Sequence, residues 1–207
     1  MKQNYTHLIL ILDESGSMGT IQNATIEGVN ALVQKQKAEP GDFTTAVYTF
    51  DDATKEVSAF TALNKDNYDP SGSTALLDAF CQAVDQEGKR LAALKESERP
   101  DKVVVVVVTD GEENSSRKFK IEDVRQRVTQ QETAYKWQFV FLGANIDAFA
   151  TGSTYNFATN NTYQFQPTVR GVQMSYSAVS TTLSSYRSGA TYAMDIQTVA
   201  KEQEQTA

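Results

Sequence analysis

Six consecutive valines at residues 103–108 constrain the fold of this chain more than any other segment. β-Branched side chains favour extended backbone. Because polar residues do not alternate with these valines, both faces of the strand must be buried, which predicts a central strand of a parallel sheet. A second unbroken apolar run, at residues 8–12, predicts another strand of the same kind. The chain therefore contains a sheet that is covered on both faces.

Segments with helical periodicity alternate with further apolar runs. Apolar residues at helical spacing predict helices over residues 20–37, 77–91, 121–128, 146–150 and 168–187. Apolar runs predict strands over residues 44–50 and 137–142, a short strand within 155–165, and a returning edge strand over 55–60. Strands that alternate with helices predict a doubly wound, Rossmann-like α/β fold: a mostly parallel central sheet with one antiparallel edge strand and helices on both faces.

The length of the chain, 207 residues, suits one α/β domain with a full core and is short for two. We predict this domain over residues 1–187. After Gly189 the chain is rich in Gln, Thr and Ala, and this composition predicts a weakly ordered polar tail over residues 188–207.

The formal net charge of −7 argues against nucleic acid as a partner, because an acidic surface repels phosphate backbones. The single cysteine, Cys81, excludes an intramolecular disulfide and favours a reducing compartment. The apolar run at residues 8–12 is too short for a signal peptide or a membrane span. We therefore expect a cytoplasmic protein that contacts no membrane.

Three oxygen-rich segments stand at predicted element boundaries. Asp13-Glu14-Ser15-Gly16-Ser17 follows the first buried strand, Ser71-Gly72-Ser73-Thr74 precedes a helix, and Thr109-Asp110-Gly111 follows the valine strand. In doubly wound sheets, ligands bind beyond the carboxyl ends of the strands, where these segments meet if the two strands are neighbours. Carboxylate and hydroxyl oxygens suit a hard cation such as Mg²⁺. The three segments therefore predict a divalent-cation site.

These segments resemble the metal-ion-dependent adhesion site (MIDAS) of the von Willebrand factor A (vWA) family, whose pattern is Asp-x-Ser-x-Ser with a distant Thr and a distant Asp. The matching residues here are Asp13, Ser15, Ser17, Thr74 and Asp110, so the site is complete. The order of the predicted elements also matches. The resemblance covers roughly residues 5–187.

The resemblance implies a role for each residue. Ser15, Ser17 and Thr74 would offer hydroxyl ligands to Mg²⁺, with Mn²⁺ or Ca²⁺ as alternatives, and Asp13 and Asp110 would act directly or through waters. A sixth coordination position would stay open for an acidic side chain of a partner protein. Two carboxylates leave a divalent cation near neutral, and an incoming carboxylate still gains an ionic bond in a cleft of low dielectric constant. Stand-alone members of this kind are expected in bacteria and their phages.

Each segment also has a purely structural interpretation. The segment from Asp13 to Ser17 could cap a helix through its serine hydroxyls, Thr74 could be a helix N-cap, and Asp110 could belong to a simple strand-end turn. Glu112 and Glu113 could form a solvated acidic loop or tune the affinity for the cation.

Two further residues carry reactive groups in other proteins. His7, the only histidine, lies near the start of the first predicted strand, far from the cation site, and we interpret it as structural. Cys81 lies on the apolar face of a predicted helix, and we place it in the core.

The favoured function is a cation-dependent protein-binding module without catalysis. One alternative is a structural or assembly protein that uses the fold without a metal. A less favoured alternative is a metal-dependent hydrolase similar to haloacid dehalogenases, but that family needs an Asp two residues after the first one, and Ser15 stands there. No His, Cys or glycine-rich phosphate loop accompanies the predicted site.

Overall fold

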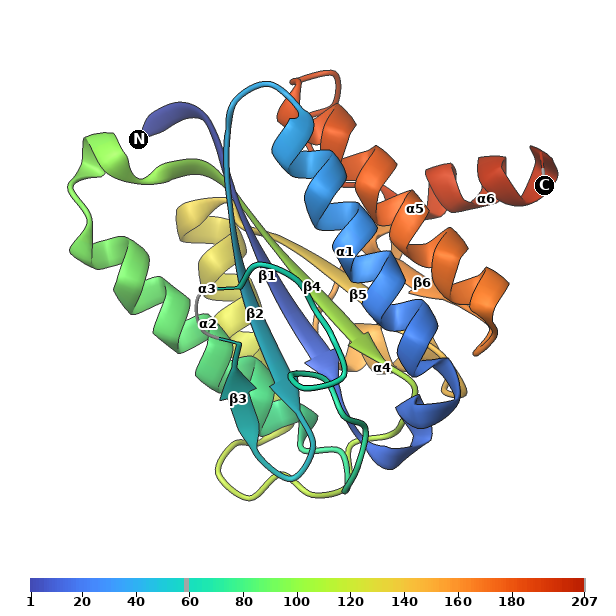
Figure 1. Cartoon of the computed structure of the whole chain (residues 1–207). Helices are drawn as coiled ribbons and strands as arrows, with labels where there is room; N and C mark the ends of the chain where they lie inside the picture. Colours follow the sequence, from blue (N-terminus) through green and yellow to red (C-terminus); the bar gives the residue numbers. More distant parts are fainter. Residues whose placement is uncertain (58–59, 207) are drawn as a thin grey trace.

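The valine run is a central strand of the sheet in the computed structural model, which describes residues 1–57 and 60–206 (Figure 1). Within those residues, one six-stranded sheet has the order β3-β2-β1-β4-β5-β6. The strands are β1 (Lys2–Asp13), β2 (Asp42–Phe50), β3 (Thr54–Glu56), β4 (Pro100–Thr109), β5 (Gln138–Gly143) and β6 (Thr162–Gln164). β3 pairs antiparallel with β2, and the other neighbours pair parallel. The predicted doubly wound fold with one antiparallel edge strand is confirmed.

Helices cover both faces of this sheet (Figure 1). One face carries α1 (Gln22–Ala38), α5 (Val169–Arg187) and α6 (Ile196–Thr206). The other face carries α2 (Leu76–Ala93), α3 (Ile121–Tyr135) and α4 (Ala148–Thr154). Short 3₁₀ helices, η1 (Gly16–Ile21), η2 (Glu96–Glu98) and η3 (Thr159–Asn161), join the larger elements.

The valines of β4 divide between the two cores, as strand geometry requires. Val104, Val106 and Val108 pack on the side of α1 and α5, whereas Val103, Val105 and Val107 pack on the side of α2 and α3. All six are at least 95 % buried, which confirms that this strand has no solvent face.

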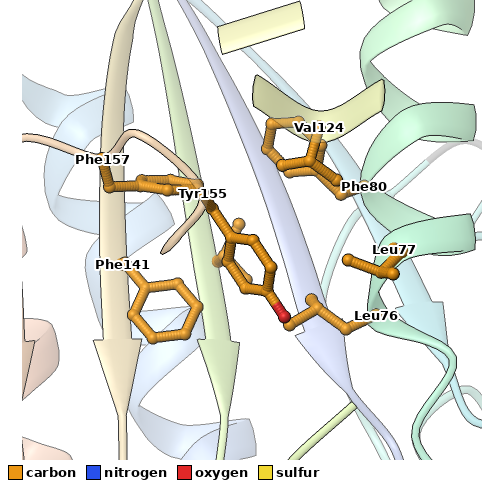
Figure 2. A pocket seen from close by; sticks show the side chains of 8 residues that line it. Leu76, Leu77, Phe80, Val124, Phe141, Tyr155 and Phe157 are labelled. Carbon is orange, nitrogen blue, oxygen red and sulfur yellow. The ribbon is translucent and has the colours of Figure 1, made fainter. Parts of the chain in front are cut away.

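The core on the side of α2 is rich in aromatic rings. Phe80, Phe139, Phe141 and Phe157 lie with ring centroids 5.5–5.9 Å apart in successive pairs. Figure 2 shows Tyr155 and Phe157 lying over this face of the sheet, opposite Leu76, Leu77, Phe80 and Val124. The cavity between these side chains holds only about 10 Å³, room for about one water molecule, so the core is closed to ligands.

Two segments differ from the sequence expectation. The edge strand spans only Thr54–Glu56 and ends before Val57, and residues 58 and 59 of the expected strand lie outside the described residues. The segment after Gly189 holds α6, although its composition predicted weak order. Met194 just before α6, and Ile196 and Ala200 within it, are buried there against the core of α5, and the four-residue spacing places Ile196 and Ala200 on one side of a largely polar helix. The domain boundary at residue 187 stays a prediction.

Parallel pairing of β1 with β4 brings the ends of these strands to one edge of the sheet. Leu12 of β1 is in register with Val108 of β4. The next residues, Asp13 and Thr109, therefore lie side by side where the two strands end. No helix in the described part of the chain is long and apolar enough to cross a membrane.

Candidate metal centre

All five predicted site residues lie near the edge where β1 and β4 end. Asp13 is the last residue of β1, and Asp110 follows β4. Ser15 immediately precedes η1, Ser17 lies in its first turn, and Thr74 precedes α2. Asp13 is 0 % exposed and Asp110 is 3 % exposed, and Ser15 and Thr74 are also buried. Only Ser17 is exposed, so its hydroxyl marks the side of the cluster that faces solvent.

Both oxygens of the Asp13 carboxylate accept hydrogen bonds. The backbone N–H of Ser15 donates to Oδ1 at 2.7 Å, and the Thr109 hydroxyl donates to Oδ2 at 2.6 Å. Thr109 Oγ1 also accepts from the backbone N–H of Gly111 at 3.2 Å. Thr109 therefore holds Asp13 in place and shapes the strand-end turn, a role that we did not predict.

The Asp110 carboxylate is only half satisfied. The Ser17 hydroxyl donates to Asp110 Oδ1 at 2.5 Å, and the hydroxyls of Ser15 and Ser17 lie 3.2 Å apart. Asp110 Oδ2 is buried and has no hydrogen-bond partner among the described residues. A buried carboxylate oxygen without a partner is costly, and a cation beside this atom would offset that cost.

Gly111 shows where the oxygens converge. A methyl group placed on its Cα would lie 3.1 Å from Thr74 Oγ1, 3.8 Å from Ser17 Oγ and 4.0 Å from Asp13 Oδ2. The glycine therefore leaves a space that three predicted ligands border. The ligand set is two carboxylates and three hydroxyls, which suits a hard cation. Among the described residues there is no group of three or more His, Cys, Asp or Glu that could hold a metal ion, so a cation here would depend on hydroxyl ligands beside the two carboxylates.

Both aspartates have raised pKa values. Burial raises the pKa of Asp13 to about 6, against hydrogen bonds from Thr109 and Ser15 that lower it, and the nearby Asp110 charge adds to the increase. Burial also raises the pKa of Asp110, and the Ser17 hydrogen bond lowers it. Two buried carboxylates side by side favour the binding of a cation, because a cation offsets their desolvation and mutual repulsion.

The structure argues against capping as the role of the hydroxyls. The N-cap of α2 is Ala75, and no side chain of the cap residue bonds the helix. Instead, Glu113 and Ser116 accept hydrogen bonds from the first backbone amides of α2, those of Leu77 and Asp78. Ser15 precedes η1 and likewise makes no side-chain cap bond. The capping interpretation of Thr74 is wrong, and its hydroxyl stays available to a ligand.

Asn114, in the loop after β4, holds the backbone of Thr74 through two hydrogen bonds. Thr74 N–H donates to Asn114 Oδ1 at 3.0 Å, and the Thr74 carbonyl accepts from the Asn114 N–H at 3.1 Å. Glu113 anchors this loop to α2, whereas Glu112 is exposed. The solvated-loop interpretation therefore fits Glu112 and fails for Glu113.

Glu14 and Tyr68 also support the site, and the sequence analysis missed both. The Tyr68 hydroxyl donates to the Asp13 carbonyl at 2.7 Å. Glu14 is buried, and its Oε1 accepts from the Asp69 N–H at 2.5 Å. These bonds tie the loop before α2 to the end of β1. Glu14 occupies a position that the MIDAS pattern leaves free, and Tyr68 lies in a polar loop without periodicity, so neither carried a signal.

His7 and Cys81 lie away from this centre. His7 is six residues before Asp13 on β1, about 20 Å along the strand. Cys81 is fully buried on α2, and burial raises the pKa of its thiol to about 12, which makes it unreactive.

Comparisons with known proteins rest on structure alone. No family model matches the chain, and no curated protein matches it either. Among solved structures, it is similar to proximal thread matrix protein 1 from the mussel byssus, whose MIDAS motif is occupied by zinc. The TM-score is 0.61 at 14 % identity, over 89 % of this chain and 47 % of that chain.

Two bacterial structures show the same fold. The vWF domain of the type V pili tip protein Mfa5 from Porphyromonas gingivalis matches with a TM-score of 0.60 at 10 % identity, over 86 % of this chain and 95 % of that chain. A von Willebrand factor type A protein from Catenulispora acidiphila matches with a TM-score of 0.58 at 14 % identity, over 86 % of this chain and 42 % of that chain. The chain spans less than half of the mussel and Catenulispora chains. At these identities the likeness establishes the architecture: this chain has the α/β fold of a von Willebrand factor A domain.

Proposed function

We propose that this chain binds one divalent cation, Mg²⁺ or Mn²⁺, with Ca²⁺ as an alternative, through Asp13, Ser15, Ser17, Thr74 and Asp110. The observation that carries the proposal is the convergence of Thr74, Ser17 and Asp13 oxygens on the space beside Gly111, next to the unpartnered Oδ2 of Asp110. The zinc-occupied MIDAS of the mussel protein supports it, because a related fold holds a divalent cation there.

The cation would supply a positive centre at the solvent-facing side of the cluster, where Ser17 is exposed. We propose that the chain acts there as a protein-binding module and that a partner presents an acidic side chain at the open coordination position. Binding is favoured over hydrolysis because Ser15 replaces the second aspartate of a haloacid dehalogenase-like site, and its hydroxyl lies 3.2 Å from that of Ser17. A cytoplasmic location stays part of the proposal.

Titration calorimetry with MgCl₂ and MnCl₂ tests the cation site. We expect one cation per chain in the wild type and none in Asp13→Ala, because that variant loses one of two buried carboxylates. Asp69→Ala is the matched control, since it removes the same charge from an exposed side chain beside the site. Equal binding by Asp13→Ala and the wild type would contradict the proposal.

Asp110→Asn gives a second, independent readout. In EDTA this variant should unfold at a higher temperature than the wild type. The raised pKa of Asp110 means that its ionised form is unfavourable in the folded state, and asparagine carries no charge there. In excess Mg²⁺ only the wild type should gain stability, by mass action on the folded state. If both proteins gain equally, the cation binds elsewhere.

The binding mode is tested by light scattering and by affinity capture, each in Mg²⁺ and in EDTA. A partner that is released by EDTA and not captured by Asp13→Ala supports the proposed module. Assembly that is identical in both buffers would favour a structural protein that uses the fold without a metal.

A further inference from the structure

A chain of hydrogen bonds crosses β1, β2 and α2 at the end of the sheet opposite the metal centre, from an exposed hydroxyl to a buried carboxylate. The Thr44 hydroxyl lies 2.8 Å from His7 Nδ1, and His7 Nε2 lies 3.0 Å from Glu87 Oε2. His7 and Glu87 are buried, and Thr44 is exposed. A hydroxyl, an imidazole and a carboxylate are thus joined by successive hydrogen bonds from the surface to the core. An activated nucleophile, its base and its orienting group have the same order.

The surroundings of Glu87 set the direction of these bonds. The Tyr48 hydroxyl donates to Glu87 Oε1 at 2.6 Å, and Arg90 Nη1 lies 2.9 Å from the same oxygen. Burial alone would raise the pKa of Glu87, but its hydrogen bonds with His7 and Tyr48 and the Arg90 charge lower it below the ordinary value. An ionised carboxylate only accepts, so Nε2 of His7 carries a hydrogen.

The hydrogen on Nε2 sets the role of Thr44 when the His7 ring is neutral, the state in which His7 can act as a base. In the neutral ring with hydrogen on Nε2, Nδ1 is an acceptor, so the Thr44 hydroxyl donates its hydrogen to His7. The Tyr5 hydroxyl, 3.0 Å from Thr44 Oγ1, is left to donate to Thr44. The Thr44 oxygen therefore faces a base that can take its proton.

Thr44 also lines a hollow of about 410 Å³ at the start of β1 and β2. This volume is in the range of small-molecule sites, whereas the apolar cavity under α2 holds about 10 Å³. Tyr5 supplies an aromatic wall, and Lys2, Asp42 and Glu98 supply charges. Lys2 Nζ is paired with Asp42 at 2.6 Å, so the net charge of the three is −1.

We propose that Thr44, His7 and Glu87 form a second site, in which the Thr44 hydroxyl accepts the acyl group of a small, uncharged aryl ester bound in this hollow. The net negative charge disfavours phosphates and carboxylates, and the Tyr5 ring beside Thr44 favours an aryl group. The site is separate from the proposed cation site, because His7 and Asp13 lie about 20 Å apart along β1.

The step balances without a further reactant except water. Thr44 Oγ1 forms a bond to the ester carbonyl carbon while its proton passes to His7 Nδ1, and the Tyr5 hydroxyl gives up its bond to Thr44 and donates to the carbonyl oxygen as that oxygen gains charge. The carbon–oxygen bond to the aryl group breaks, and the phenol leaves with the proton from His7. Water then cleaves the acyl-threonine, which restores the hydroxyl and releases the carboxylic acid. Glu87 is a positioning residue, because it holds His7 and does not touch the ester.

The full chain incubated with 4-nitrophenyl acetate tests this proposal. Release of nitrophenolate gives the rate, and peptide mapping by mass spectrometry gives the acetylated residue. We expect acetylation of Thr44, absent in Thr44→Val and retained in Thr44→Ser. The rate above background should fall about 100-fold or more in His7→Gln, the usual contribution of a general base. Glu87→Gln should lower kcat more than it changes KM, because the hollow is intact and only the orientation of His7 is lost.

One variant and one change of buffer serve as controls. Thr45→Val removes the neighbouring hydroxyl, which points to the opposite face of the strand, and should react like the wild type. The wild-type rate should be the same in EDTA and in excess Mg²⁺, so failure of the metal site and failure of this site are distinguishable. Acetyl groups on lysines with Thr44 unmodified, or equal rates in Thr44→Val and Thr44→Ser, would overturn the proposal. Circular dichroism melting curves identify any variant that fails to fold, and the Thr44 pair then decides alone.

Discussion

Gly111 controls the room that is left between the oxygens of the metal centre. Its backbone does not need glycine, because among the described glycines only Gly41, Gly72 and Gly189 have positive φ. The missing side chain matters instead for the space beside Thr74, 3.1 Å from a methyl group at this position. Gly111 therefore contributes space beside the ligands, which a single methyl group would fill.

Gly111→Ala should weaken Mg²⁺ binding at least tenfold, about 1.4 kcal/mol, because the methyl group occupies the space that Thr74 and Ser17 border. Stability in EDTA should change by less than about 1 kcal/mol, since Thr74 Oγ1 can rotate away. Calorimetry and chemical unfolding measure the two quantities. Gly19→Ala is the control, because a methyl group there meets nothing within 4 Å. Unaltered affinity in Gly111→Ala would mean that the cation lies outside this space.

The predicted ligands could be found from the sequence, because their spacing and their place at strand ends form a pattern. The residues that hold these ligands in position could not be found in this way. Tyr68 reaches the Asp13 carbonyl over 55 positions of the chain, and Asn114 reaches Thr74 over 40. Such contacts depend on how loops fold back over the sheet edge, and no local periodicity reports them.

At the scale of elements, α2 organises the loop that follows β4. Asp78 accepts hydrogen bonds from the backbone amides of Arg117, Lys118 and Phe119 at 2.9–3.3 Å. In the other direction, Glu113 of the loop accepts a hydrogen bond from the backbone amide of Leu77 in α2. Hydrogen bonds in both directions therefore fix the loop against α2. Because Asn114 of this loop bonds the backbone of Thr74, they also help to position Thr74.

Asp78→Ala should free these three amides and loosen the loop. We expect hydrogen exchange at residues 117–119 to become at least tenfold faster, and Mg²⁺ affinity to fall, because Asn114 no longer holds Thr74 firmly. Asp85→Ala, which removes an α2 carboxylate paired with Arg127 instead, is the comparison. If exchange accelerates and affinity is unchanged, the loop does not position the cation ligand.

The His7–Glu87 junction gives the fold a pH dependence of definite sign. The pKa of Glu87 is lowered in the folded state, so its ionisation stabilises the fold above the unfolded pKa, and this stability is lost as pH falls through the folded pKa. Glu87→Gln should therefore cost about 2–4 kcal/mol near pH 7, and the difference from the wild type should shrink below about pH 4.5. Urea unfolding at several pH values measures it.

Glu122→Gln is the matched control for this experiment. Glu122 is exposed and lies 3.8 Å from Arg125, so its loss should change stability by less than about 0.5 kcal/mol at any pH. A constant difference between Glu87→Gln and the wild type from pH 7 to pH 3 would contradict the lowered pKa.

At the scale of the whole molecule, α6 extends the core beyond the last helix that the sequence predicted with clear periodicity. Met194 N–H donates to Gln138 Oε1 at 3.1 Å, and Asn160 Nδ2 donates to the Met194 carbonyl at 3.3 Å. Most residues of α6 are polar and exposed, so the composition of this segment did not indicate the few buried residues that attach the helix to the core. The central strands and the major helices were predictable because their apolar patterns are long, whereas α6 depends on a few tertiary contacts.

Ile196→Ala should lower the free energy of unfolding by about 2–4 kcal/mol, because Ile196 is fully buried and a cavity would remain. Lys201→Ala on the same helix, at an exposed position, should have little effect. Thermal and urea unfolding in EDTA measure both without a contribution from the cation. Equal stabilities would indicate that α6 packs too weakly to belong to the core.

The position of β1 has a mechanical consequence. It lies between β2 and β4 and is parallel to both, in register over Tyr5–Asp13 on one side and Thr6–Leu12 on the other. A pull on the N-terminus acts along the strand, so it loads both ladders of hydrogen bonds in shear and all together. Such a strand should yield in one high-force event in a single-molecule pulling experiment, and Asp13, at the far end, should keep its place until that event.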